Sequence, residues 1–177
     1  MSRTTTHNWL FNTLLLGIAA TLFAGCAAGP TTRINAGADK PITDALGNAW
    51  LADSGFVGGS TVDRGNIKIE NTKIPEIYRT EHWGMTAFAY KVPNGKYAVK
   101  LHFAETYEGV TAAGQRLFTL SVEGKEIKDL DVFKEAGGAN KAFVKPVDVA
   151  VNDGELNITF KEGEQNPEIN GIEIIPR

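Results

Sequence analysis

A period-two alternation of apolar and polar residues recurs along most of this chain and limits the folds that it can form. In the run from Tyr97 to Phe103 every second residue is apolar, whereas Lys100 and His102 point to the opposite face. Four further runs alternate in the same way: Leu117–Val122, Val147–Val151, Leu156–Phe160 and Ile172–Ile174. Because successive side chains of a strand point to opposite faces, these runs predict β-strands.

Turn signals that contain glycine separate the runs and complete an all-β prediction. They are Pro93-Asn94-Gly95, Glu123-Gly124-Lys125, Asn152-Asp153-Gly154 and Glu162-Gly163-Glu164. Each supplies a residue that tolerates a positive φ between two strands. Short strands joined in this way predict a two-sheet antiparallel β-sandwich. The polar, glycine-rich stretch 39–73 is expected to form long loops over one edge or end of it.

The composition excludes several classes of protein. The chain has 18 Lys and Arg against 21 Asp and Glu, a net charge of -3, so binding to nucleic acid through a basic surface is not expected. Motifs for nucleotides, zinc proteases and serine hydrolases are absent, and no cofactor is predicted. His82 and His102 lie without cysteines that could join them in a metal site, so no metal site is expected. A surface or loop position is expected for both histidines.

The first 25 residues predict a lipoprotein signal peptide. Arg3 precedes an apolar stretch of about eleven residues, which is shorter than the about 20 that span a bilayer. Phe23-Ala24-Gly25-Cys26 resembles a lipobox, in which Cys26 becomes the lipidated first residue. Cleavage after Ala28, or a buried helix, are the alternatives. We therefore expect residues 26–32 to be a tether, residues 33–177 to be one domain, and the protein to lie on the periplasmic side of the outer membrane.

Two aromatic residues are the strongest candidates for ligand contact. Trp83 lies in a segment without strand alternation, and Tyr107 follows a predicted strand where a loop should begin. An aromatic ring beside polar groups suits the apolar face of a sugar, whose hydroxyls also need hydrogen-bond partners. Packing of both rings on the core is the alternative.

Acidic residues near these rings raise the possibility of glycoside hydrolysis. Glu105 and Glu108 lie close in sequence, and Glu81 could approach them in space. Such chemistry needs two carboxyl groups about 5–9.5 Å apart. Since acidic residues are numerous in this small domain, solvated carboxylates are the expected explanation and the domain is predicted not to be an enzyme.

The segments around the two rings resemble the malectin domain, a carbohydrate-binding β-sandwich of jelly-roll, galactose-binding-like fold. The resemblance covers Arg33 to Pro176 and rests on six pieces in the order of the family. They are Ile34-Asn35-Ala36-Gly37, DALGNAWLADSGF (44–56), IYRTEHWG (77–84), GKYAVKLHFAETYEG (95–109), GQRLFTLSVEG with LDVF (114–124 and 130–133), and NPEINGIEI (166–174).

The resemblance implies a set of sugar-contacting residues. Trp83 stands at the position of a sugar-contacting Tyr, Tyr107 matches another, Glu108 replaces a Phe, and Gln165 replaces an Asp. The complete implied set is Trp83, Tyr107, Glu108, Gln165, Asn166, Arg64, Asp63 and His82. Asp44, Trp50, Asp53 and Glu81 are expected to belong mainly to the scaffold: turn-forming carboxylates, and a loop ring packed on the core.

The resemblance also implies a function. The chain is expected to bind a gluco-oligosaccharide or a related glycan without catalysis. Together with the predicted lipidation of Cys26, this describes a lipid-anchored protein of the cell envelope. A module that binds another envelope protein or peptidoglycan through the same edge is the alternative.

Overall fold

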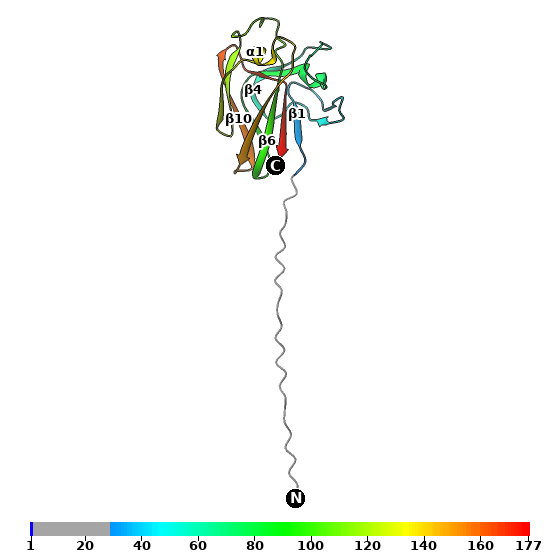
Figure 1. Cartoon of the computed structure of the whole chain (residues 1–177), viewed down its shortest axis with the longest axis vertical. Coiled ribbons are helices and arrows are strands. Elements are labelled where there is room, and N and C mark those ends of the chain that lie inside the picture. The colour runs from blue at the N-terminus through cyan, green and yellow to red at the C-terminus, as the bar shows by residue number, and fades with distance from the viewer. Residues whose placement is uncertain (2–28) are drawn as a thin grey trace.

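Two antiparallel sheets form the domain in the computed structural model, which describes Met1 and residues 29–177 (Figure 1). The four-stranded sheet contains, in order, β1 (Thr32–Asn35), β12 (Gly171–Pro176), β6 (Gly95–Phe103) and β9 (Phe143–Val151). The six-stranded sheet contains β11 (Glu168–Ile169), β5 (Thr80–Lys91), β10 (Glu155–Glu164), β7 (Leu117–Val122) and β8 (Lys125–Leu130), and β4 (Phe56–Asp63) pairs with β5. The predicted antiparallel β-sandwich is confirmed.

The remaining elements are short. They are the hairpin of β2 (Ile42–Thr43) and β3 (Ala49–Trp50), the 3-10 helix η1 (Pro75–Tyr78) and the helix α1 (Val132–Ala136). No helix in the described residues is long and apolar enough to cross a membrane. The predicted signal peptide and Cys26 lie outside the described residues.

The alternating residues pack between the two sheets, as their pattern predicts. Leu101 and Phe103 of β6 are fully buried, and they share one core with Leu120 of β7 and Ile158 of β10. The pairing of β7 with β10 brings Val122 opposite Ile158, so the apolar faces of both strands coincide. Each such side chain contributes about 1.5–3 kcal/mol when it leaves water.

The outer face of the four-stranded sheet is also covered, which the sequence pattern does not reveal. His102 points to this face and is buried, between an edge contact with Trp50 at 5.4 Å and a hydrogen bond of 2.7 Å to the Tyr78 hydroxyl. Its other ring nitrogen lies 3.1 Å from Glu173. The predicted surface position of His102 is therefore wrong, because the hairpin β2–β3 and η1 fold over this part of the sheet.

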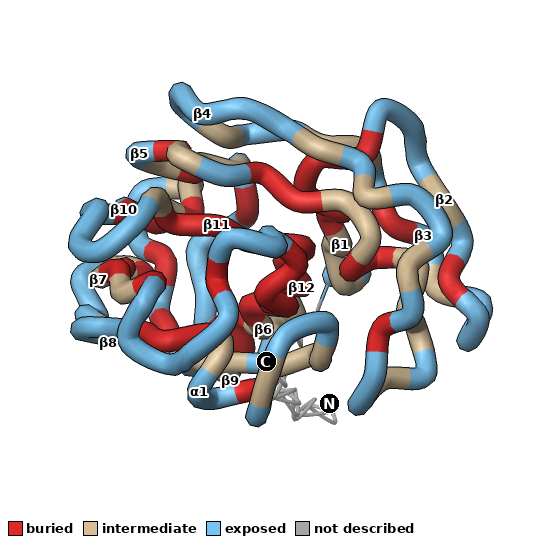
Figure 2. Tube along the Cα trace, turned by 90° about the horizontal axis from the view of Figure 1, so that it is seen from above, coloured by how far each residue is buried: buried red, intermediate tan, exposed pale blue. Residues whose placement is uncertain are grey.

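Two further predictions about local structure are wrong. The stretch 39–73, expected to be loops, contains the eight-residue strand β4, whose adjacent residues Gly58 and Gly59 interrupt any alternation. The expected turn at residues 162–164 lies inside β10, where the pairing with β7 shifts by one residue as a β-bulge. Figure 2 shows β4 as a largely exposed outer strand, whereas β11 and β12 are buried.

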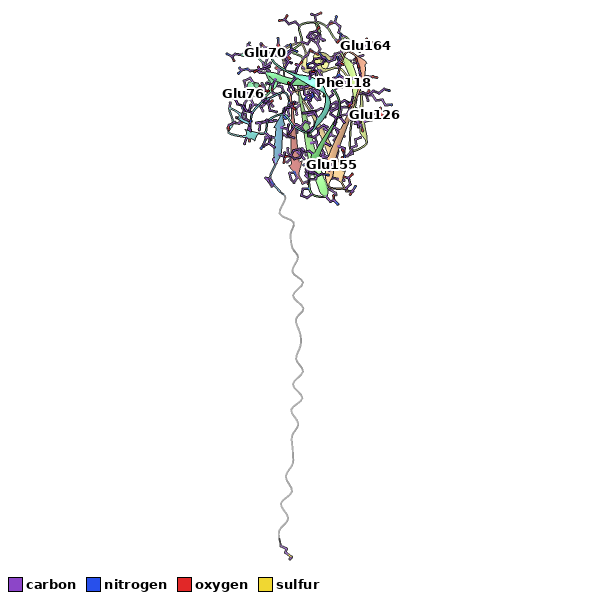
Figure 3. All side chains as sticks on the ribbon, turned by 180° about the vertical axis from the view of Figure 1, so that it is seen from behind. Glu70, Glu76, Phe118, Glu126, Glu155 and Glu164 are labelled. Carbon is purple, nitrogen blue, oxygen red and sulfur yellow. The ribbon has the colours of Figure 1, made fainter. Side chains whose placement is uncertain are left out.

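The two ends of the sandwich differ in what they carry. Residue Thr32 of β1 pairs with Ile174 of β12, so the chain comes into the domain and leaves it at one end (Figure 1). Helix α1 lies at the opposite end. In Figure 3, the labels of Glu155 and Glu164 mark where β10 starts and finishes at these two ends.

Candidate functional site

A cavity of about 520 Å³ opens near the α1 end, where β5 begins and β10 finishes. Its volume lies in the range of about 300–1,000 Å³ that is usual for small-ligand sites. Five separate segments of the chain meet there. The lining residues are Thr61, Val62, Arg64, Glu81, Trp83, Tyr107, Arg116, Gln165 and Asn166.

Trp83 forms one aromatic wall, and the prediction that it lies in a loop is wrong. It belongs to β5, between Ser60 of β4 and Glu168 of β11. Gly59 permits this pairing, since it has a φ of 81° and a Cβ atom there would lie 2.7 Å from the amide nitrogen of Met85 and closer still to the Trp83 carbonyl oxygen. The Trp83 side chain keeps a relative exposure of 37%, so the indole can contact a ligand.

Tyr107 forms a second aromatic wall from a loop, as predicted. It follows β6, where its amide donates to Glu105 at 3.0 Å and its carbonyl oxygen accepts from the Val110 amide at 3.0 Å. These two bonds fix the backbone of the turn, while the residue is 44% exposed. Both rings therefore line the same cavity and neither is buried in the core.

One arginine at the cavity is held by a buried carboxylate. The Arg64 Nη2 atom donates to Glu81 at 2.8 Å, and its Nε donates to the Thr106 hydroxyl at 3.2 Å. That hydroxyl in turn donates to the other Glu81 oxygen. Glu81 is 2% exposed, and its charge is compensated by Arg64. The Nη1 atom of Arg64 has no hydrogen-bond partner among the described residues.

A second arginine, directly before β7, is held in the same manner. Arg116 donates to both oxygens of Glu105, at 2.6 and 3.3 Å, and also to the backbone carbonyl of Asn166. Arg116 and Glu105 are both buried. The bidentate pair ties the segment after β6 to the start of β7, and the bond to the Asn166 carbonyl ties the loop that precedes β11 to the same arginine.

A third carboxyl group, Glu168, completes the charged floor. It is fully buried, and neither of its oxygens has a hydrogen-bond partner in the described part of the chain. Burial raises the pKa of Glu168 well above its ordinary value, and the nearby charges of Glu105 and Glu81 raise it further. Burial also raises the pKa of Glu105, against the effect of Arg116. The positive charges of Arg116 and Arg64 lower the pKa of Glu168 but do not cancel this rise.

The arrangement suits recognition of a polar ring-shaped ligand. Apolar ring faces are available from Trp83 and Tyr107, and hydrogen-bonding groups are available from Arg64, Gln165 and Asn166. Arg64 and Arg116 are already paired with Glu81 and Glu105, so these charges need little reorganisation when a ligand excludes water. No group of three His, Cys, Asp or Glu side chains that could hold a metal ion occurs in the described residues.

The structure brings five of the eight implied sugar-contacting residues into this cavity. They are Arg64, Trp83, Tyr107, Gln165 and Asn166. Glu108 lies beyond Tyr107, in a neighbouring cavity. Asp63 lines a different cavity, and its carboxylate accepts from the Gly65 amide at 2.7 Å.

His82 is a structural residue in this fold, contrary to the expectation that it lies at the surface and contacts sugar. It is 7% exposed, and its two ring nitrogens lie 2.9 Å from the Asp53 carboxylate and 2.9 Å from the Gly58 carbonyl oxygen. Burial alone would lower the pKa of His82, but these two acceptors and the Asp53 charge raise it. The imidazole thus ties β4 and the preceding loop to β5.

The scaffold assignments are borne out at Asp44 and Trp50. The Asp44 carboxylate accepts from the Trp50 indole at 2.9 Å and from the Leu46 and Asn48 amides at 2.9 Å. Trp50 is packed inside, although it lies in β3 rather than in a loop. Glu81 has a second role, because it also lines the cavity.

A β-sandwich with such a cavity belongs to the class of ligand-binding modules, and comparison with known proteins identifies which one. The malectin domain model matches residues 31–173. The chain therefore belongs to the malectin domain family, whose domain is a carbohydrate-binding, non-catalytic module.

Proteins whose sequences are similar to that of this chain include plant receptor-like kinases. A probable LRR receptor-like serine/threonine-protein kinase of Arabidopsis thaliana is 34% identical over 122 residues, which cover 64% of this chain and 12% of that protein. A probable receptor-like protein kinase of the same plant is 32% identical over 146 residues, covering 72% and 17%. This chain thus spans less than a fifth of the length of these two relatives.

Two solved structures illustrate the shared fold. The plant receptor-like kinase FER superposes with a TM-score of 0.72 at 22% identity, covering 82% of this chain and 48% of that one. A Bacteroides uniformis beta-glucuronidase superposes with a TM-score of 0.75 at 20% identity, covering 84% and 18%. At this level of identity the likeness concerns the fold.

Proposed function

We propose that this domain binds a carbohydrate, without altering it, in the cavity between Trp83 and Tyr107. The observation that carries the proposal is the pair of exposed rings on one cavity of a malectin domain, above a floor of paired charges. A sugar would place an apolar face on a ring, while Arg64, Gln165 and Asn166 bind its hydroxyl groups. A gluco-oligosaccharide is the ligand class that we propose.

Hydrolysis is disfavoured by the positions of the acidic residues. Glu105 is fully buried under its bidentate bond with Arg116, and Glu81 is engaged by Arg64 and Thr106. A general acid must reach the glycosidic oxygen, and these two groups are committed to other partners. Glu108 is separated from them by Tyr107.

Isothermal titration with gluco-oligosaccharides tests the proposal. The wild-type domain should bind with a Kd in the range of about mM to μM, and Trp83→Ala should weaken binding by at least about tenfold, since it removes a stacking surface. Leu46→Ala is the matched control, because this exposed side chain lies in the β2–β3 hairpin, away from the cavity. Absence of binding to any oligosaccharide of a broad glycan array would refute the proposal.

A protein or peptidoglycan partner at the same end is the second candidate. One solved structure of similar fold, FER, is described in complex with the plant peptide RALF23 and with LLG2. This candidate predicts that a pull-down recovers one stoichiometric partner whose binding is insensitive to added sugar and survives Trp83→Ala.

We further propose that the protein is a lipoprotein of the bacterial envelope. Residues 1–25 would be its signal peptide, and Cys26 would carry the lipid at the start of the tether 26–32. The folded domain, 33–177, would then face the periplasm from the outer membrane. The support is the apolar N-terminal stretch followed by the single Cys of the chain.

A further inference from the structure

A second cavity adjoins the first across the ring of Tyr107. Its volume is about 400 Å³, and Tyr107 belongs to the lining of both cavities. Thr106 provides another link, because it lines the second cavity while its hydroxyl donates to Glu81 in the first. The two cavities therefore share Tyr107 as a common wall.

We propose that the binding site is a two-part groove that holds a glycan of at least three sugar units, with Tyr107 between the parts. This inference rests on the proposed function of the first cavity. The first units would lie between Trp83 and Tyr107, and the chain would continue over the Tyr107 ring into the second cavity. Both volumes fall within the range of about 300–1,000 Å³ for ligand sites.

The Tyr107 ring is positioned as a fixed wall. It lies directly on the backbone of Gly109, where an added Cβ atom would come within 2.7 Å of Cζ and 2.9 Å of the hydroxyl oxygen. One part of the ring is thus supported by glycine, while the residue as a whole stays 44% exposed. A ring held in place by the backbone loses little rotational freedom when a ligand stacks on it.

The far wall of the second cavity is also held by hydrogen bonds. Asn140 lines it, and the Asn140 amide donates to the Glu105 carbonyl oxygen at 2.9 Å. The loop after Tyr107 is tied to α1, because Asp131 accepts from the Gly114 amide at 2.7 Å and caps the helix through the Lys134 amide at 2.9 Å. The second cavity is therefore formed before any ligand arrives.

The chemistry of the second cavity differs from that of the first and indicates what it holds. Its side chains include Phe133 and Val110, which are apolar, and Glu108, Thr111 and Asn140, which are polar. The only charged side chain among those that line it is the carboxylate of Glu108, whereas Arg64 and Arg116 line the first cavity. A carboxylate accepts hydrogen bonds from hydroxyl groups and repels an acidic sugar. The second part of the groove is therefore suited to a neutral, hydroxyl-bearing sugar unit.

The test is a titration of the folded domain with gluco-oligosaccharides of two to six units. In the wild type, we expect affinity to rise at least about tenfold from the disaccharide to the tetrasaccharide. Ala139→Trp should remove this rise, because it fills the second cavity from an exposed position, and should leave disaccharide binding unchanged. Ala45→Trp is the matched control, since Ala45 is exposed in the β2–β3 hairpin.

A second variant does not depend on adding bulk. Glu108→Ala removes the exposed carboxylate and should weaken binding of the longer oligosaccharides alone. Equal affinity for all lengths, or a length dependence that survives both substitutions, overturns the two-part groove while the proposed sugar binding stands. No binding of any oligosaccharide by the folded wild-type domain overturns both.

Discussion

At the scale of single residues, the buried carboxyl group of Glu168 is expected to make the stability of the folded domain depend on pH. It is buried under the cavity without a hydrogen-bond partner in the described residues, next to Arg116 and Glu105. Burial raises the pKa of Glu168, whereas Glu105 and Glu81 are each paired with an arginine. The folded protein thus holds a proton that the unfolded chain releases above the ordinary pKa of a glutamate.

This linkage predicts how Glu168→Gln changes stability. Because the pKa of Glu168 is raised on folding, wild-type stability should be lost as the pH rises above about 4.5, by up to roughly 1.4 kcal/mol per pH unit. The variant has no proton to release, so the difference in unfolding free energy should move in its favour as the pH rises. Urea unfolding at several pH values measures this, with the exposed Glu162→Gln as control. Parallel pH profiles of wild type and Glu168→Gln would contradict it.

The buried charged residues could have been predicted from the sequence by continuing the period-two pattern beyond the last apolar residue of each strand. Arg116 is in phase with Phe118 and Leu120, and Glu105 is in phase with Phe103, so both point to the buried side. The sequence predicted Tyr107 in a loop and Trp83, wrongly, also in a loop, and it pointed to no role for Arg116. A charged residue on the inward face of a strand is a signal for a paired, buried ion, but its partner lies on another strand and has to be seen in the fold.

At the scale of elements, the strand pair β4–β5 positions the indole wall. β5 has β11 and β10 along one side and β4 along the other, so Trp83 is fixed through its backbone on both sides. Gly58 and Gly59 let β4 approach it with a bulge in the register. The placement of Trp83 therefore depends on a strand that contributes few core residues.

We expect Gly59→Ala to disturb this wall. The new Cβ atom would collide with the Trp83 carbonyl, and φ at this position is 81°, so a loss of about 1–3 kcal/mol and weaker sugar binding should follow. Gly47→Ala is a matched control, because Gly47 has a φ of 83° and open space around it. Denaturant unfolding and Trp fluorescence measure the difference. If both variants lose the same stability and bind alike, the contact with Trp83 is not the cause.

Strands with regular alternation could be predicted from the sequence. The glycine-containing strand β4 and the burial of His102 under other segments could not. The predicted run 117–122 coincides with β7, and the run from Tyr97 lies within β6. β4 was missed because its two central glycines carry no side chain to show a period. The burial of His102 was missed because it depends on η1 and the β2–β3 hairpin, which are distant in sequence.

At the scale of the whole molecule, the cavities and the chain termini lie at opposite ends of the sandwich. The chain enters β1 and leaves β12 at one end, and α1 lies at the other (Figure 1). The cavity is lined by residues from the start of β5 and the end of β10, at the α1 end. A protein held to a membrane through residues before β1 would therefore expose the groove on the side away from the bilayer. This geometry agrees with the proposed lipid anchor at Cys26.

The anchor makes a prediction for the full chain. Expressed in a Gram-negative bacterium, the wild type should sediment with the outer membrane and incorporate labelled palmitate. Cys26→Ala should abolish the label and move the protein largely into the soluble fraction. Titration of the released variant should give wild-type sugar affinity, since Cys26 lies far along the chain from the cavity residues. Unlabelled wild-type protein in the soluble fraction would contradict the anchor.

The adjacency of Thr32 and Ile174 also makes this fold easy to splice into other proteins. A host needs only two neighbouring positions, such as those of a hairpin turn, to accept the whole unit without stretching its own backbone. The inserted domain would then project from the host with the proposed binding cavity on the side away from it. Grafting the domain into the surface loop of an unrelated enzyme is thus a direct way to confer carbohydrate affinity on it.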